Sequence, residues 1–395
     1  MASFNSDRRP DPEVLVQENN SSTRTLALNR PRHMNALSLE MFSRLSDLFL
    51  AYDHDTKVKL VMLKGTGKAF SAGGDIAAIA RHLTNGDWRS VVKESDEAYK
   101  LLFLIATYSK PQLSVLNGIA IGRGACIFLP SKFRIVTENS TFSIPETALG
   151  GFPDMGASYF LSRFPGFFGE YLVLTGAKLE GPEMLACGLA THFVPATKLT
   201  LLEEALACKV ASTNDSTSIT DLLFYISAVI NEYSVQPALK ETGSACHKMD
   251  VIEKCFSNRT VEEILSALEK EADTYLEDDP WMLSTIQSLK KASPTGLKIS
   301  LRSIREGRSQ GLGECLVREH RMLYHLVRGK VSRDFIEGCT TLLWDKNKIH
   351  KWNPCKLELV TDQMIDLFFS KLDDDAEPEE LKLPERSNLR TIAKL

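Results

Sequence analysis

The 395-residue sequence lacks the cysteine spacing of a zinc ribbon or of a disulfide-rich domain. Its eight cysteines are widely spaced, and no two of them form a Cys-x-x-Cys pair. Small secreted domains depend on closely spaced disulfides, whereas a reducing compartment keeps thiols free. We therefore expect an intracellular protein with free cysteines and without a metal site.

Long apolar runs and an excess of one charge are missing as well. Residues 1–12 have no apolar core and carry acidic side chains, so the sequence predicts neither a secretory signal nor an acid-poor transit peptide. No apolar run approaches the roughly 20 residues that a membrane-spanning helix needs. Because 47 basic and 51 acidic residues are scattered along the chain, we expect neither nucleic acid nor a membrane as a partner.

Strands and helices are predicted to alternate over the first 200 residues. Apolar residues at 58–63 and 113–116 predict buried strands, and helical spacing over 92–105 predicts a helix between them. After residue 200 most segments read as helices. We predict an N-terminal extension, an α/β core, an α-rich region and a charged tail, with the bounds 1–12, 13–200, 201–371 and 372–395.

Two glycine-dense turns each follow a predicted strand and precede a helix. Residues 69–76 read Ala-Phe-Ser-Ala-Gly-Gly-Asp-Ile, and residues 118–126 read Gly-Ile-Ala-Ile-Gly-Arg-Gly-Ala-Cys. Glycine lets the backbone approach a ligand closely, and the first turn of a helix has N–H groups without partners in the helix. Two such sets of N–H groups that converge on one carbonyl oxygen would suit thioester or enolate chemistry.

Two carboxylates follow the second turn in a loop rich in glycine and proline. Glu146 lies in Pro-Glu-Thr, and Asp154 lies in Phe-Pro-Asp. A carboxylate beside the N–H groups would complete a site for acyl chemistry, as a general base or as a nucleophile. Two structural roles remain open at this point, because Glu146 could form an ordinary salt bridge and Asp154 could cap a helix.

These motifs resemble the crotonase (enoyl-CoA hydratase/isomerase) superfamily and, within it, the 3-hydroxyisobutyryl-CoA hydrolase branch. The resemblance covers residues 13–195 closely and 290–355 more loosely. It implies an α/β fold, a spiral of repeated ββα units with a helical C-terminal region. It also implies hydrolysis of a short 3-hydroxyacyl-CoA, above all 3-hydroxyisobutyryl-CoA in valine breakdown, with coenzyme A as part of the substrate and no separate cofactor.

The resemblance assigns roles to single positions. The N–H groups of Gly74 and Arg123 would form the oxyanion hole, and Glu146 matches the catalytic glutamate. Asp154 matches the aspartate that holds the 3-hydroxyl of the substrate and assists proton transfer. Coenzyme A would contact the loop over 30–37 and the first glycine turn through these residues: Arg32, His33, Ala72, Asp75 and Ile76. For Asp75, a helix cap is the alternative.

Three positions depart from the family pattern. Arg123 replaces the middle of three glycines, and Ala98 stands where the hydrolases have a substrate-binding glutamate, so that Glu97 is the candidate to replace it. Cys126 stands where hydratases have a second glutamate, which favours a hydrolase. Arg123 and Ala98 keep two alternatives open, a catalytically weakened acyl-CoA-binding paralogue and an enoyl-CoA hydratase or isomerase.

The chain ends in Ala393-Lys394-Leu395, which resembles the Ser-Lys-Leu peroxisomal address. The tripeptide follows a polar tail that would leave it accessible. On this basis we expect a peroxisomal location and a peroxisomal import receptor as partner. A match of three residues can also arise by chance.

Overall fold

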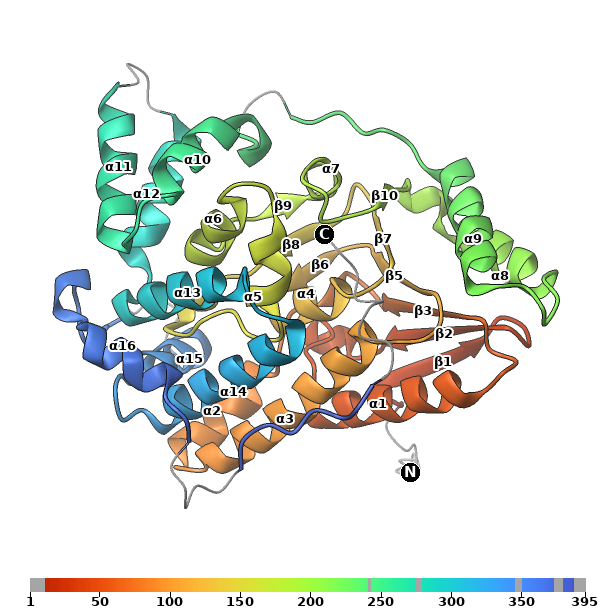
Figure 1. Ribbon diagram of the computed structural model, residues 1–395, viewed down its shortest axis with the longest axis horizontal. Helices are drawn as coiled ribbons and strands as arrows, with labels where there is room; N and C mark the ends of the chain where they lie inside the picture. The colour runs from red at the N-terminus through yellow and green to blue at the C-terminus, as the bar shows by residue number, and fades with distance from the viewer. Residues whose placement is uncertain (1–10, 241–242, 275–278, 345–349, 373–378, 387–395) are drawn as a thin grey trace, which may run out of the picture.

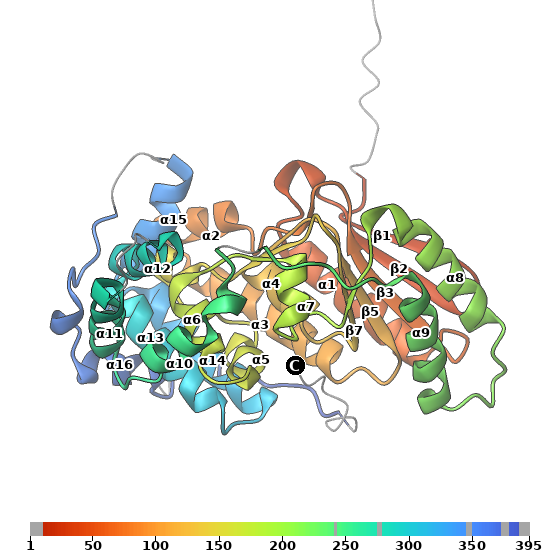
Figure 2. The same ribbon diagram turned by 90° about the horizontal axis from the view of Figure 1, so that it is seen from above.

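The computed structural model describes residues 11–240, 243–274, 279–344, 350–372 and 379–386. Figure 1 shows the larger sheet toward the right of the view and the C-terminal helices toward the left. In Figure 2, α8 and α9 lie at the end of the molecule opposite α11 and α16. The elements that form the candidate site lie between these two ends.

The larger sheet has six strands in the order β1-β2-β3-β5-β7-β10. Strand β1 pairs antiparallel with β2, and the other neighbouring pairs are parallel. The strands are β1 Val14–Glu18, β2 Thr23–Leu28, β3 Leu60–Gly65, β5 Gln112–Leu116, β7 Phe133–Val136 and β10 His192–Phe193. Four helices pack on this sheet, α1 Leu39–His54, α3 Trp88–Ala106, α8 Leu199–Ala211 and α9 Ile219–Tyr233.

The side chains of β3 alternate between two hydrophobic clusters. Leu60 and Met62 belong to a cluster that contains residues of α8 and α9. Val61 and Leu63 belong to the main cluster, which contains residues of α1 and α3. Because both faces of the strand are covered, its first four residues are all apolar and buried.

The smaller sheet has four strands in the order β4-β6-β8-β9. They are β4 Ala69–Ser71, β6 Ile119–Ile121, β8 Thr141–Ser143 and β9 Leu179–Glu180. Strands β4, β6 and β8 each follow a strand of the larger sheet, and the first two lead into helices α2 (Ile76–Thr84) and α4 (Arg123–Phe128). This repetition confirms the predicted spiral of ββα units. Gly118 lies between β5 and β6 of one such unit, where a Cβ atom would lie 2.3 Å from the carbonyl oxygen of Lys68.

The remaining helices include the predicted α-rich region. They are α5 Ala157–Phe160, α6 Phe168–Thr175, α7 Gly181–Ala186, α10 Met249–Phe256, α11 Val261–Thr274, α12 Pro280–Lys291, α13 Pro294–Gly307, α14 Leu312–Arg328, α15 Asp334–Trp344 and α16 Asp362–Phe369. Helix α14 packs on α3, and α15 packs on α2 and on the 3-10 turn η2 (Glu146–Leu149). The main hydrophobic cluster therefore runs from Val14 to Leu381. The division of the chain into four regions stays a prediction.

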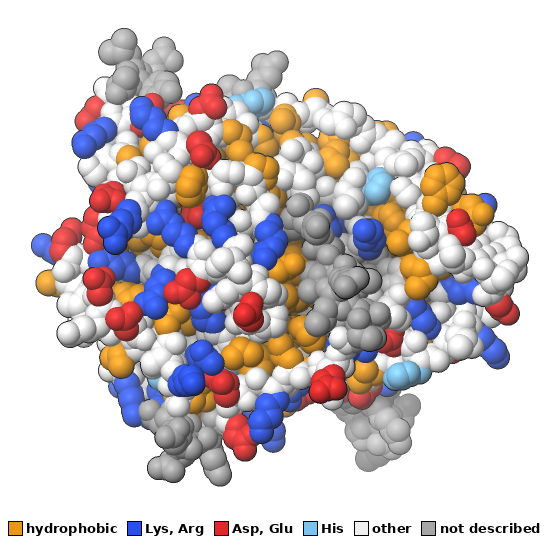
Figure 3. Space-filling view, in the orientation of Figure 1, with side chains coloured by type: hydrophobic (Ala, Val, Ile, Leu, Met, Phe, Trp, Pro, Cys, Tyr) orange, Lys and Arg blue, Asp and Glu red, His pale blue; other side chains and the backbone are white. Residues whose placement is uncertain are grey.

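The surface agrees with the scattered charges of the sequence. Figure 3 shows acidic and basic side chains interspersed over one face, with apolar side chains between them. None of the helices in the described ranges is both long enough and apolar enough to cross a bilayer. No group of three or more His, Cys, Asp or Glu side chains within those ranges could hold a metal ion.

Candidate active site

A cavity of about 80 Å³ lies between the two glycine turns. Gly74 of the first turn and Arg123 of the second turn line it, together with Glu146 and Asp154. Three apolar side chains of α14 and α15 also line it, Leu323, Leu326 and Phe335. The structure thus brings together the four residues to which the sequence assigned the reaction.

The two turns lie in contact with each other. A Cβ atom on Gly74 would be 3.4 Å from Cδ of Arg123, and one on Gly73 would be 4.0 Å from the backbone nitrogen of Arg123. Arg123 is the first residue of α4, so its N–H group belongs to the unpaired first turn of a helix. Among the described residues, neither the N–H of Gly74 nor that of Arg123 donates a hydrogen bond. Both are free to bind a carbonyl oxygen.

The arginine in the second turn is accommodated without backbone strain. The left-handed conformation of this turn falls on Gly122, with φ of 54°, and not on Arg123. A Cβ atom on Gly122 would lie 2.5 Å from Oε1 of Glu146, so glycine is required there for a second reason. Arg123 therefore replaces the middle glycine without strain, because the neighbouring glycine adopts the unusual angle.

Glu146 is the first residue of η2, and its carboxylate lies beside the second turn. Its Oε2 atom is buried and has no hydrogen-bond partner in the part of the chain that the structure describes. Burial raises the pKa of Glu146 to about 8, and the negative charge of Asp154 acts in the same direction. Among the described residues Glu146 forms no ion pair, so the alternative of an ordinary salt bridge is not observed.

Asp154 has the opposite surroundings. Its Oδ2 accepts hydrogen bonds from the Tyr99 hydroxyl at 2.9 Å and from Nη2 of Arg123 at 2.7 Å. The Nε atom of Arg123 lies 3.1 Å from Oδ2 and 3.3 Å from Oδ1. The residue at the N-terminus of α5 is Gly156, with no side-chain cap, so the alternative role of Asp154 as a helix cap is not observed.

The Arg123 side chain crosses the site and is buried with Asp154, with 9% and 7% of the two side chains exposed. Its Nη2 also donates to the Ser95 hydroxyl at 2.9 Å. Burial alone would lower the pKa of this guanidinium, but the charge of Asp154 raises it above its ordinary value. The site therefore contains a permanent positive charge that is neutralised by Asp154.

Glu97 does not reach this site. It pairs with Lys100 at 3.1 Å on the partly exposed face of α3, and it does not line the cavity. The acidic residue on the buried face of α3 is Glu94, whose pKa is raised by burial and lowered to a smaller extent by Arg123. Its Oε1 atom is buried without a partner. The predicted substrate contact of Glu97 is thus not supported, and Glu94 is the acidic residue of α3 on which the charge of Arg123 acts.

The predicted coenzyme A residues divide into three groups. Ala72 and Ile76 line the cavity, whereas Arg32 and His33 are exposed in the 3-10 turn η1 (Pro31–His33). Asp75 caps α2 by accepting the Ala78 N–H at 3.0 Å, and it also pairs with Arg30. This agrees with its alternative role.

The loop over 30–37 and the first glycine turn are joined by hydrogen bonds. The Leu37 N–H donates to Gly73 O at 2.7 Å, and the Asp75 N–H donates to Leu37 O at 3.1 Å. The buried Asn35 side chain donates to Thr66 O and Ala69 O, both at 2.8 Å. Sequence reasoning did not single out Asn35, although its positive φ of 53° is typical of asparagine in turns.

Comparisons with known proteins support a hydrolase branch. The protein named 3-hydroxyisobutyryl-CoA hydrolase 1 of Arabidopsis thaliana is 54% identical over 97% of this chain and 98% of its own length. The mouse protein named 3-hydroxyisobutyryl-CoA hydrolase, mitochondrial, is 36% identical over 91% of this chain and 89% of its own length.

The predicted peroxisomal location is contradicted by these comparisons. Two relatives have a compartment in their names, the mouse hydrolase and the 41% identical 3-hydroxyisobutyryl-CoA hydrolase-like protein 1 of Arabidopsis thaliana, and both are called mitochondrial. The expected import receptor depended on the same tripeptide. Ala393 to Leu395 lie outside the described residues.

The match to the family extends over nearly the whole chain. A crystal structure of a carnitinyl-CoA dehydratase from Mycobacterium thermoresistibile superposes with a TM-score of 0.80 at 28% identity, covering 94% of this chain and 98% of that one. The family model described as enoyl-CoA hydratase/isomerase matches residues 23–369. The chain belongs to the enoyl-CoA hydratase/isomerase (crotonase) family.

Proposed function

We propose that the chain is an acyl-CoA thioester hydrolase that acts on 3-hydroxyisobutyryl-CoA, a reaction of valine breakdown. Three Arabidopsis relatives at 53% or 54% identity carry the name 3-hydroxyisobutyryl-CoA hydrolase, two of them as probable. One observation carries the proposal: Glu146, whose Oε2 atom has no partner among the described residues, lies in one cavity with the free N–H groups of Gly74 and Arg123. Coenzyme A belongs to the substrate, and no further cofactor takes part.

In this reaction the N–H groups of Gly74 and Arg123 bind the thioester carbonyl oxygen and stabilise the charge that develops on it. The ionised Glu146 then has two routes. It takes a proton from a water molecule that attacks the thioester carbon, or it attacks that carbon itself and forms an anhydride that water resolves. In both routes the carbon–sulfur bond breaks, and coenzyme A leaves as the thiol.

Asp154 retains capacity to bind the 3-hydroxyl of the substrate. Its Oδ1 atom has one long contact with Arg123, at 3.3 Å, whereas Oδ2 takes three hydrogen bonds. A carboxylate offers about four acceptor positions, so Oδ1 can accept a further hydroxyl hydrogen. We assign Asp154 to this contact, with Arg123 fixing its orientation.

Coenzyme A lies along the loop over 30–37 and the first glycine turn in this proposal. Ala72 and Ile76 contact the part of the substrate inside the cavity, and Arg32 and His33 contact the part outside it. The support for this placement is that Ala72 and Ile76 line the cavity while the two basic residues are exposed.

The chemistry of Cys126 is unfavourable for the addition of water to an enoyl-CoA. Its thiol is buried, its pKa is raised well above the ordinary value by burial, and its Sγ donates to the backbone oxygen of Asp154 at 3.3 Å. A buried thiol in that state is a poor substitute for a glutamate that must deliver a proton. The hydratase is therefore the weaker candidate.

The buried pair of Arg123 and Asp154 favours a second candidate, an acyl-CoA-binding paralogue with little catalysis. In that protein the arginine would occupy the volume that the acyl group of the substrate needs. The two candidates share the binding of acyl-CoA and differ in turnover.

The test is release of thiol from a panel of acyl-CoA esters by the full chain, with Glu146→Gln and Arg123→Gly as variants. We expect release from 3-hydroxyisobutyryl-CoA by the parent and its loss in Glu146→Gln, which keeps the shape of the side chain. Release by Arg123→Gly but not by the parent would establish the paralogue instead. Loss of enoyl absorbance with crotonyl-CoA would establish the hydratase.

A further inference from the structure

The turn that carries Asp154 has an unusual backbone. Met155 has a φ of 56° and the following Gly156 has a φ of 77°, so two successive residues are left-handed. The left-handed region is unfavourable for a residue with a side chain, and such a conformation persists only where the surroundings hold it. The direction of the Asp154 side chain therefore depends on whatever fixes this turn.

A buried glutamate of α14 holds the turn. The Oε2 atom of Glu319 accepts the Gly156 N–H at 2.7 Å. Its Oε1 atom accepts the Ser158 N–H at 3.1 Å and the Ser158 hydroxyl at 2.6 Å. Glu319 is fully buried, and the mechanism described above does not use it.

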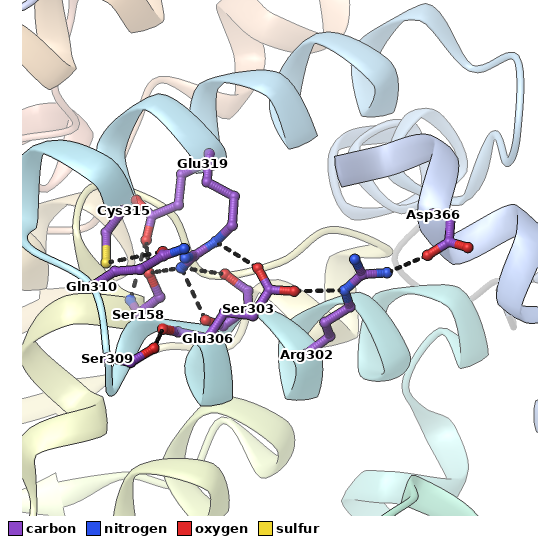
Figure 4. Close-up of polar contacts among 10 residues, drawn as sticks. Ser158, Arg302, Ser303, Glu306, Ser309, Gln310, Cys315, Glu319 and Asp366 are labelled. Atoms are coloured by element: carbon purple, nitrogen blue, oxygen red, sulfur yellow. Dashed lines mark hydrogen bonds and ion pairs between the residues drawn. The ribbon is translucent and has the colours of Figure 1, made fainter. Parts of the chain in front are cut away.

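The same turn is connected to the surface through Arg318. Its Nη2 donates to the Ser158 hydroxyl at 2.7 Å and to Ser303 O at 2.9 Å. Its Nε lies 3.8 Å from Oε2 of Glu306. Figure 4 shows Ser158, Ser303 and Glu319 close together, and the contacts that continue from Glu306 through Arg302 to Asp366 of α16. Of the side chains in this series of contacts, Glu319 is the one whose two carboxylate oxygens both bind the turn over 154–158.

The hydrogen bonds favour the ionised form of Glu319, which accepts at both oxygens. All three partners donate, and two of them are backbone N–H groups that cannot turn around. A proton on the carboxyl group would turn one of these acceptor positions into a donor, and of the three partners only the rotatable Ser158 hydroxyl could accept from it. Loss of the proton and fixation of the turn are therefore linked.

Glu319 changes its charge near neutral pH. Burial raises the pKa of Glu319 to about 7, while the Ser158 hydroxyl, the Arg318 charge and the Gly156 N–H oppose that shift. The titratable groups whose charges act on Glu319, or on which it acts, come from four elements: Arg318 and Cys315 of α14, Asp154 of the turn, Tyr99 of α3 and Cys126 of α4. Both charge states are therefore populated in the range where an enzyme of this kind is assayed.

We infer that Glu319 is a positioning residue, whose ionised carboxylate fixes the turn over 154–158 so that Asp154 faces the 3-hydroxyl of the substrate. The inference rests on the proposed function, because it assigns Glu319 to substrate discrimination at that same site. Glu319 itself does not line the cavity. It acts through Asp154, and its effect is confined to substrates that carry the 3-hydroxyl.

The test compares 3-hydroxyisobutyryl-CoA with isobutyryl-CoA, which lacks that hydroxyl. The quantity is the ratio of the two kcat/KM values, in which the titration of Glu146 cancels because both substrates need it. For Glu319→Gln we expect the ratio to fall at least tenfold, with kcat/KM for isobutyryl-CoA within threefold of the parent. Glu306→Gln, a matched change farther along the same contacts, is expected to leave the ratio unchanged.

The parent protein provides a second measurement that does not depend on the folding of a variant. Its ratio is expected to fall as the pH is lowered from 8 to 6, whereas the ratio of Glu319→Gln stays flat. An equal loss on both substrates in Glu319→Gln, or a parent ratio that does not change with pH, would overturn the inference. If the chain releases no thiol from any ester, the proposed function is wrong. The inference is then tested with the ratio of the parent's dissociation constants for isobutyryl-CoA and 3-hydroxyisobutyryl-CoA.

Discussion

Glu146 and Asp154 lie in one loop and line one cavity, yet their surroundings are opposite. Glu146 has a buried oxygen without a partner and a pKa raised to about 8. Asp154 receives hydrogen bonds from two side chains, one of them a guanidinium. A carboxylate that must react gains from lacking partners, because every hydrogen bond to its charged form would weaken it as a base. A carboxylate that must orient a substrate gains from fixed partners.

The same contrast separates the two glycine turns. The first turn presents the N–H of Gly74, a residue without a side chain, whereas the second presents the N–H of Arg123 together with that residue's buried side chain. The arginine therefore connects the proposed oxyanion hole to Asp154 through its own side chain. We call the part of the site with Glu146 the reacting half, and the part with Asp154 and the Arg123 side chain the binding half. Four predictions test this division.

The largest effect is expected for Glu146→Gln. The change keeps the shape of the side chain but removes the base or nucleophile, so kcat for 3-hydroxyisobutyryl-CoA should fall ~10²–10⁴-fold. The dissociation constant of the substrate should change little, because Asp154 and both N–H groups remain. Thiol release under saturating substrate measures the first quantity and calorimetry the second. A large change in affinity with unchanged kcat would place Glu146 in the binding half instead.

Removal of the Arg123 guanidinium should have the next largest effect. Arg123→Met leaves Asp154 buried without its counter-ion, and breaking a buried ion pair in this way costs about 3–5 kcal/mol. The free energy of unfolding in urea measures the loss. The double variant with Asp154→Asn should be more stable than Arg123→Met alone, since both charges are then gone. Strictly additive effects would show that the two side chains are not coupled.

The pH dependence should follow the reacting half. Because Glu146 must be ionised and burial raises its pKa to about 8, kcat/KM for isobutyryl-CoA should rise roughly tenfold per pH unit below 8 and level off above it. Stability should change in the opposite direction. A carboxyl group whose pKa is higher in the folded state stabilises the protein at low pH, and this contribution is lost as the pH rises from ~4.3, the value for an unfolded chain, to about 8.

Glu146→Gln is the control for both parts of that prediction. Its unfolding free energy should exceed that of the parent by an amount that grows as the pH rises toward 8. A parent profile of kcat/KM that is flat between pH 6 and 8 would contradict a buried glutamate as the base.

Much of this site could be predicted from the sequence. The two turns are visible because glycine clusters between apolar runs are local signals, and both lie where the sequence placed them. The alternation of apolar runs predicted repeated strands and helices, and the resemblance to the family implied the spiral of ββα units. The role of Glu146 stays a prediction, although its position in the cavity agrees with it.

The side-chain contacts could not be predicted, because they depend on directions and on distant parts of the chain. On α3 the buried positions include Glu94, Ser95 and Tyr99, so Glu97 points to the partly exposed face although it is next to the position that the family uses. Glu319 meets Gly156 across 163 residues of sequence, a contact that only tertiary packing creates. A helical pattern with buried positions marked on α3 would have indicated Glu94.

The smallest effect is expected for Tyr99→Phe, which tests how much the binding half depends on a single neutral hydrogen bond. Tyr99 is buried, and its hydroxyl donates to Asp154, which keeps Arg123 as a second partner after the exchange. We expect a loss of about 1 kcal/mol in unfolding free energy. KM for 3-hydroxyisobutyryl-CoA should rise a few-fold at nearly constant kcat. Tyr108→Phe is the matched control, because the buried Tyr108 hydroxyl has no hydrogen-bond partner among the residues described and its removal should not destabilise the protein. Equal losses of stability in the two variants would mean that the Tyr99 hydroxyl does not support Asp154.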